Sequence, residues 1–199
     1  ELNGMHVAVS RTGWSGELGY EIYLKDHVNG NELWDTIMAA GEAYNIAPAA
    51  PNTIRSIEGC LLSYFSDIRR VDNPYTFGLD RLVSLDKKAD FIGREALRRI
   101  HATGNIRRMV GIEISGEPIS HNESYWYIIR KGKSIGHVRR CVWSPRLERN
   151  IGLANLPADM AGAGSKVIVL APDGIRRAVV VDTPWFEPQK TIPADVAAG

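Results

Sequence analysis

The sequence predicts an α+β fold, with a sheet and helices in its first half and an all-β second half. Strand and helix patterns both occur along residues 1–103, whereas helical patterns stop beyond residue 104. Several short strands with regular turns are typical of a small sandwich or barrel. We therefore expect an α+β region over residues 1–103, an all-β region over residues 104–187 and a disordered tail over residues 188–199.

Two strands are predicted near the N-terminus, because apolar residues occupy every second position of residues 5–10 and 20–25. The glycine-rich segment Thr12–Gly19 lies between them. Side chains alternate between the two faces of a strand, so Glu21 and Tyr23 share one face of the second strand.

Three helices are expected next. Residues 31–43 and 52–61 carry apolar side chains at helical spacing, and each segment begins with an asparagine that can cap the first turn. A shorter helix is expected over residues 93–99, behind Asp90. Residues 101–104 are interpreted as a linker.

The second half is predicted to consist of short strands. Lys131-Gly132 and Pro172-Asp173-Gly174 supply the residues that tight hairpin turns need. The expected strands are residues 109–114, 125–130, 134–142, 151–156, 166–170 and 176–182.

Composition excludes several classes of function. The 199 residues include 24 Lys and Arg against 23 Asp and Glu, so the net charge of +1 does not favour nucleic acid as a partner. An apolar run of roughly 20 residues and a signal peptide are both lacking, which predicts no membrane partner and a cytoplasmic location. Cys60 and Cys141 lack metal-ligand spacing and are interpreted as packing thiols, with no metal expected.

Residues Arg11–Glu21, with the sequence RTGWSGELGYE, are the most informative segment. Three glycines permit a tight loop, and Trp14 offers a flat surface. A phosphate-binding P-loop would need Gly-Lys-Ser/Thr after its glycines, and a dinucleotide site would need a helix there. A strand follows instead, so neither site is predicted.

Arg11–Glu21 resembles the R-T-G-[YW]-[ST]-G-E-x-G-[YF]-E signature of the glycine-cleavage T-protein (aminomethyltransferase) family. Asn52–Gly59 resembles the family's central helix, and Asp90–Leu97 matches its D-F-I-G-[RK]-E-A-L element. Residues 134–136 and 143–145 are more loosely similar to its C-terminal barrel. The resemblance implies the C-terminal part of a T-protein-like fold, with an antiparallel sheet and helices followed by a small all-β barrel.

The resemblance also implies tetrahydrofolate as cofactor and assigns candidate binding residues. Glu21 corresponds to the family carboxylate that binds the pteridine, and Trp14 to the aromatic position beside it. Tyr23 could pack against the cofactor, Arg55 could bind a benzoyl or glutamyl carboxylate, and Tyr64 is a further candidate. Without the resemblance, the same residues would be interpreted as surface or packing residues.

Some residues depart from the family pattern. Members often have Tyr-Gly-Asn-Asp where this chain has Tyr64-Phe65-Ser66-Asp67, so a bulky ring replaces a permissive glycine. Glycine-cleavage members usually carry Ala-Arg-Asp where residues 50–52 are Ala-Pro-Asn. Residues 51–52, 57–59 and 73–74 are more similar to the branch that contains dimethylsulfoniopropionate demethylase.

The function implied by the resemblance is transfer of a methyl or aminomethyl carbon from a small amine or sulfonium donor to tetrahydrofolate. Glu1 is not methionine and a strand begins close to it, so we expect the family's N-terminal half to be missing and the chain alone to be inactive. No catalytic residue is assigned, because the family supplies its acidic residue from that half.

Three alternatives remain open. The chain could be the folate-binding module of a flavin-linked amine dehydrogenase, which extra N-terminal sequence with a dinucleotide fingerprint would reveal. It could be a non-catalytic folate-binding protein, although such relatives carry a Lys-Gly-Cys motif where residues 89–93 are Ala-Asp-Phe-Ile-Gly. A structural domain without folate is the third.

Overall fold

A computed structural model describes residues 1–13, 18–50, 52–104 and 106–186. The chain divides into two compact units, with the boundary between Asn52 and Thr53. The expected tail at residues 188–199 lies outside the described residues, and the domain boundary expected after residue 103 remains a prediction.

The first unit contains a two-stranded antiparallel sheet, as predicted. Strand β1 (Val7–Ser10) pairs with β2 (Glu21–Leu24), and Ser10 lies opposite Glu21. Helix α1 (Gly30–Gly41) follows the 3-10 turn His27–Asn29 and leads into a second 3-10 turn, Glu42–Tyr44. The predicted helix over residues 31–43 is therefore present and begins one residue earlier.

The second unit begins with helix α2 (Thr53–Glu58), followed by 3-10 turns at Pro74–Phe77 and Asp80–Leu82 and by helix α3 (Arg94–Thr103). Helix α2 ends at Glu58 and is therefore shorter than the helix predicted over residues 52–61.

Helix α3 extends through residues predicted to form a linker. The Thr103 hydroxyl donates a hydrogen bond to the Arg99 carbonyl oxygen at 2.9 Å, and the helix ends at Gly104, whose φ of 80° favours glycine. At its start, Gly93 has a φ of 92°, and the Arg94 guanidinium donates to the carbonyl oxygens of Leu85 and Lys87. The Gly-Arg pair of the DFIGREAL element therefore fixes the beginning of this helix.

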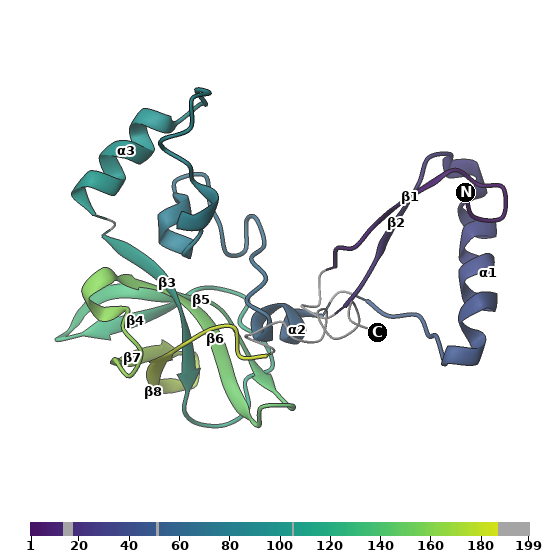
Figure 1. Ribbon diagram of the computed structural model, residues 1–199. Coiled ribbons are helices and arrows are strands. Elements are labelled where there is room, and N and C mark those ends of the chain that lie inside the picture. The colour runs from purple at the N-terminus through teal and green to yellow at the C-terminus, as the bar shows by residue number, and fades with distance from the viewer. Residues whose placement is uncertain (14–17, 51, 105, 187–199) are drawn as a thin grey trace. The chain divides into compact units, whose positions relative to one another are not determined.

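The remaining strands form a closed antiparallel barrel in the order β3-β6-β5-β4-β7-β8, which confirms the expected all-β part (Figure 1). The strands are β3 (Arg107–Ile114), β4 (Trp126–Arg130), β5 (Lys133–Ser144), β6 (Arg149–Pro157), β7 (Lys166–Ala171) and β8 (Gly174–Val181). Both predicted hairpin turns are present. Lys131 and Gly132, at φ 49° and 74°, connect β4 to β5, and Pro172 and Asp173 connect β7 to β8.

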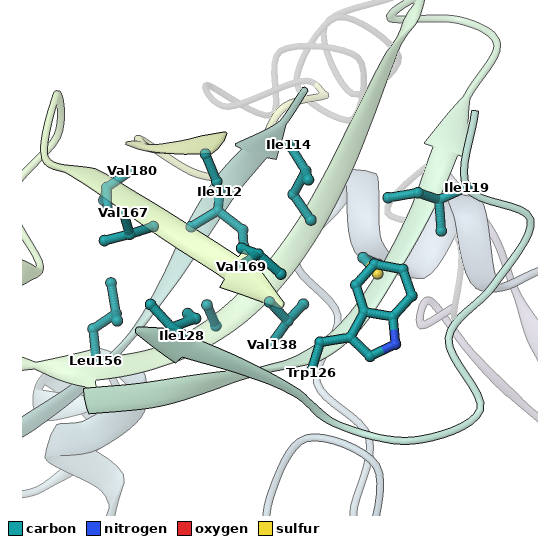
Figure 2. Close-up of a cluster of buried hydrophobic side chains, with 13 residues drawn as sticks. Ile112, Ile114, Ile119, Trp126, Ile128, Val138, Leu156, Val167, Val169 and Val180 are labelled. Carbon is teal, nitrogen blue, oxygen red and sulfur yellow. The ribbon is translucent and has the colours of Figure 1, made fainter. Parts of the chain in front are cut away.

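Alternation along the strands fills the barrel interior with mostly aliphatic side chains and with Trp126 (Figure 2). Ile112, Ile128 and Val169 are fully buried there, each contributing about 1.5–3 kcal/mol. Gly136 of β5 cannot be replaced easily, because a Cβ atom would lie 2.2 Å from the Asn155 carbonyl oxygen on β6. This close approach explains the glycine in the segment Ser134-Ile135-Gly136.

A second apolar cluster joins helix α2 to the outside of the barrel. Ile57 of α2 is fully buried against Val142, Ile151 and Leu153 of strands β5 and β6. The backbone N–H of Trp185 donates to the Glu58 carbonyl oxygen at 2.9 Å. These contacts fix α2, and with it Arg55, relative to the barrel.

The two cysteines are free thiols. Cys141 lies in the barrel interior, where burial raises the pKa of its thiol to about 12. Burial also raises the pKa of Cys60. Thiols in this protonated state are poor nucleophiles, as expected for packing residues.

Candidate functional site

Glu21 lies at the start of β2 with its carboxylate exposed. The Thr12 hydroxyl donates a hydrogen bond to Glu21 Oε2, and Thr12 Oγ1 also lies 3.3 Å from Ser10 Oγ. Thr12 is the second residue of the glycine-rich signature. Its hydrogen bond to the Glu21 carboxylate therefore links the start of the glycine-rich loop to strand β2. Sequence reasoning did not single out Thr12.

Tyr23 lies on the same face of β2, as predicted, and its side chain is 55% exposed. A hydrogen bond to the Glu21 carboxylate, followed by the charge of that carboxylate, raises the pKa of the Tyr23 hydroxyl above its usual value. A carboxylate has about four lone-pair sites. With Thr12 as a donor and the Tyr23 hydroxyl close by, Glu21 keeps room to accept further hydrogen bonds from a ligand.

The loop that follows Thr12 is closed at its base. A Cβ atom on Gly13 would lie 3.8 Å from Gly19 Cα, so the two ends of the glycine-rich segment lie side by side. Trp14, the predicted aromatic neighbour of the cofactor, lies outside the described residues.

Arg55 lies on α2, with its side chain 37% exposed. Its Nη1 atom is 3.7 Å from Oε2 of Glu58, one helical turn later. Glu58 is 2% exposed, accepts a hydrogen bond from the Ser144 hydroxyl at 2.6 Å and lies 3.9 Å from Arg146 Nη1. A buried carboxylate between two guanidinium groups therefore orients Arg55, and sequence reasoning gave Glu58 no role.

Tyr64 is 55% exposed, and its ring centroid lies 4.4 Å from that of Phe65. The loop that carries both rings is fixed by Asp67, which is fully buried and accepts a hydrogen bond from the Ser63 amide at 2.8 Å. Arg140 of β5 binds Asp67 through two hydrogen bonds, of 2.7 and 2.5 Å.

Arg140 also connects this loop to helix α2. Its guanidinium donates to the Ser56 hydroxyl at 2.8 Å and to the Leu61 carbonyl oxygen at 3.0 Å. One arginine thus joins the barrel, α2 and the loop of Tyr64. The partners are up to 84 residues apart in sequence, so no local pattern could have identified the network.

Phe65 adopts a left-handed backbone, with φ of 72°, at the position where family members often have glycine. For a residue with a Cβ atom this conformation costs roughly 1–2 kcal/mol. The Phe65 ring is 79% exposed, so removing it loses little buried area. We expect Phe65→Gly to raise the free energy of unfolding by about 1 kcal/mol in urea titrations.

Phe65→Ala is the matched control, because it removes the ring but keeps the strained Cβ atom. It should give no such gain. Equal effects of both substitutions would show that the ring, rather than the backbone, decides stability at this position.

Two of the candidate residues, Glu21 and Tyr23, lie together in the first unit, and two others, Arg55 and Tyr64, lie in the second. Two protein-family models match the chain and identify its family. The GCVT N-terminal domain matches residues 1–87, and the glycine cleavage T-protein C-terminal barrel domain matches residues 107–187. The chain belongs to the glycine cleavage T-protein family. The resemblance inferred from the sequence is thereby confirmed.

Several relatives of this T-protein family chain are similar over most of its length. Dimethylsulfoniopropionate demethylase DmdA of Ruegeria pomeroyi is 31% identical over 184 residues, covering 92% of the chain and 50% of the relative. The aminomethyltransferase of Geobacillus kaustophilus is 34% identical over 193 residues, covering 96% and 52%. The chain spans about half the length of the curated relatives it matches.

A solved structure of the glycine cleavage system aminomethyltransferase T from Bartonella henselae has the same fold. Its TM-score is 0.79 at 21% identity, covering 90% of this chain and 50% of that one. The T-protein fold class with its C-terminal barrel is thus confirmed. Within the described ranges, no helix has the length and apolar character needed to cross a bilayer.

Proposed function

We propose that the protein is a tetrahydrofolate-dependent one-carbon transferase, with Glu21 binding the pteridine. The observation that carries the proposal is the Glu21 carboxylate itself. It is exposed on the signature strand, is oriented by the Thr12 hydroxyl, and has more lone-pair sites than this hydrogen bond uses. A pteridine presents a ring N–H and an exocyclic amine on one edge, which one carboxylate can accept together.

Bound tetrahydrofolate supplies the nucleophilic N5 that takes up the one-carbon unit. The chain's own residues would orient and hold it. Tyr23 adds an exposed ring beside Glu21, and Trp14 is proposed as the second aromatic neighbour.

Arg55 and Tyr64 are proposed as further cofactor-binding residues. The Arg55 guanidinium can bind a carboxylate in a bidentate manner, and Glu58 limits its freedom before the ligand arrives. The exposed Tyr64 ring can pack against an aromatic part of the cofactor. Such positioning removes much of the entropic cost of a two-substrate reaction.

The donor is proposed to be a small amine or sulfonium compound in the cytoplasm. Relatives named aminomethyltransferase and a relative named dimethylsulfoniopropionate demethylase support these two donor classes. Their names also favour a transferase over a non-catalytic folate-binding protein.

The test is an assay of tetrahydrofolate consumption with amine and sulfonium donors. The complete reading frame that contains residues 1–199 should consume tetrahydrofolate with one donor class. Residues 1–199 alone should be at least about a hundredfold slower, because a partial site orients its reactants poorly.

The aminomethyltransferase of Geobacillus kaustophilus serves as the positive control for the amine assay. Comparable turnover by residues 1–199 alone would contradict the proposed division of the site. No consumption with either donor class, despite tetrahydrofolate binding, would favour a binding protein instead.

A further inference from the structure

A second group of polar residues, separate from the proposed cofactor residues, lies on the second unit. The lining of a pocket of about 340 Å³ includes Arg69, Arg107, Arg139, His137 and Asp72, beside Val71, Ile106 and three uncharged polar residues. These side chains come from β3, from β5 and from the segment between α2 and the first 3-10 turn of the unit. The lining therefore includes three guanidinium groups and one carboxylate, a difference of two positive charges.

The one carboxylate is already bound. Asp72 accepts two hydrogen bonds from Arg139, at 3.0 and 3.2 Å, and another from the Arg69 amide at 2.8 Å. Arg107 donates to the side-chain amide and carbonyl oxygens of Asn155 and to the carbonyl oxygen of Ile135. Among the residues of the lining, Asp72 alone carries a carboxylate, against the three guanidinium groups.

Two buried nitrogen atoms at the pocket lack a hydrogen-bond partner within the described part of the chain. They are Nε of Arg139, whose side chain is 4% exposed, and Nε2 of His137. A buried polar group without a partner destabilises the folded state. Both residues line the pocket, so part of its polar lining is without a hydrogen-bond partner in the described residues.

His137 and Arg69 of the lining are held in place by Tyr125, which lies next to the pocket. His137 stacks on Tyr125, with ring centroids 4.8 Å apart and an interplanar angle of 13°. The Arg69 guanidinium lies 4.6 Å from the Tyr125 ring centroid, and its Nε donates to the Tyr125 hydroxyl at 3.1 Å. The cationic groups are thus arranged before any ligand binds.

We propose that this pocket binds a small anion bearing a phosphate or carboxylate group, with Arg69, Arg107, Arg139 and His137 as its binding residues. Oxyanions accept the charge-assisted hydrogen bonds that guanidinium groups donate. The volume of about 340 Å³ suits a small molecule and not a folded partner.

Electrostatics at His137 agree with this assignment. Burial, followed by the charges of Arg139, Arg107 and Arg69, lowers the pKa of His137 to about 4, and Asp72 opposes the shift. A bound anion adds negative charge beside the imidazole, so it should raise the pKa of His137.

The test follows the His137 imidazole of residues 1–199 by NMR at constant ionic strength, with His137→Gln used to assign its signal. Inorganic phosphate and glutarate are titrated separately. A saturable shift and a raised pKa of His137 are expected with at least one of them. The tighter probe identifies the group as phosphoryl or carboxylate, and no saturable shift with either overturns the proposal.

Two exposed neighbours provide a matched pair of variants. Arg69→Gln should raise the Kd of the tighter probe about fivefold, because it removes a charge at the pocket. Arg70→Gln removes the same charge next to it, outside the lining residues, and should change Kd less than about twofold. Equal weakening by both variants would show general charge attraction instead of a site.

Discussion

Replacing Glu21 by alanine should lower the affinity for tetrahydrofolate at least about tenfold. The substitution leaves the pteridine donors without their acceptor, and lost hydrogen bonds to a charged group are worth about 1.5–3 kcal/mol. The Thr12 hydroxyl would also lose its acceptor. Calorimetry on the complete reading frame measures the change directly.

Glu42→Ala is the control for general loss of negative charge in the same unit, since Glu42 is exposed on a 3-10 turn after α1. It should leave folate affinity unchanged. Unchanged affinity in Glu21→Ala would remove Glu21 from the cofactor site.

Replacing Asp67 by alanine should lower the free energy of unfolding by about 3–5 kcal/mol. Asp67 is fully buried, and the substitution leaves the Arg140 guanidinium, only 11% exposed, without its charged partner. The Ser63 amide also loses its acceptor. Urea titration of residues 1–199 measures the effect.

Asp86→Ala, at an exposed position, should cost less than about 0.5 kcal/mol. The double variant Asp67→Ala with Arg140→Met should be more stable than Asp67→Ala alone, because the unpaired buried charge is gone. A loss below 1 kcal/mol in Asp67→Ala would mean that the loop of Tyr64 does not depend on this ion pair.

Much of the fold could be predicted because its signals are local. Alternation over a few residues identified β2 and the barrel strands, and glycine at Lys131-Gly132 identified a hairpin. The predicted end of α3 was wrong. Threonine is common in linkers, but here the Thr103 hydroxyl donates a hydrogen bond within the last helical turn.

The network around the candidate site depends on contacts between distant residues. Arg140 donates hydrogen bonds to Asp67, 73 residues away in sequence, and Arg107 donates to Asn155, 48 residues away. Chain topology creates these pairs, so only the folded structure reveals them. The left-handed backbone of Phe65 was equally hidden, although the family's glycine at that position was a hint.

The most direct test of the proposed cofactor contact is a thermodynamic cycle between Glu21→Ala and a tetrahydrofolate analogue that lacks the exocyclic amino group. If the carboxylate accepts a hydrogen bond from that group, the analogue binds the unaltered protein more weakly but binds Glu21→Ala no worse than tetrahydrofolate does. The account predicts a coupling free energy of at least about 1 kcal/mol by calorimetry. Losses that simply add would contradict a direct contact between Glu21 and the pteridine.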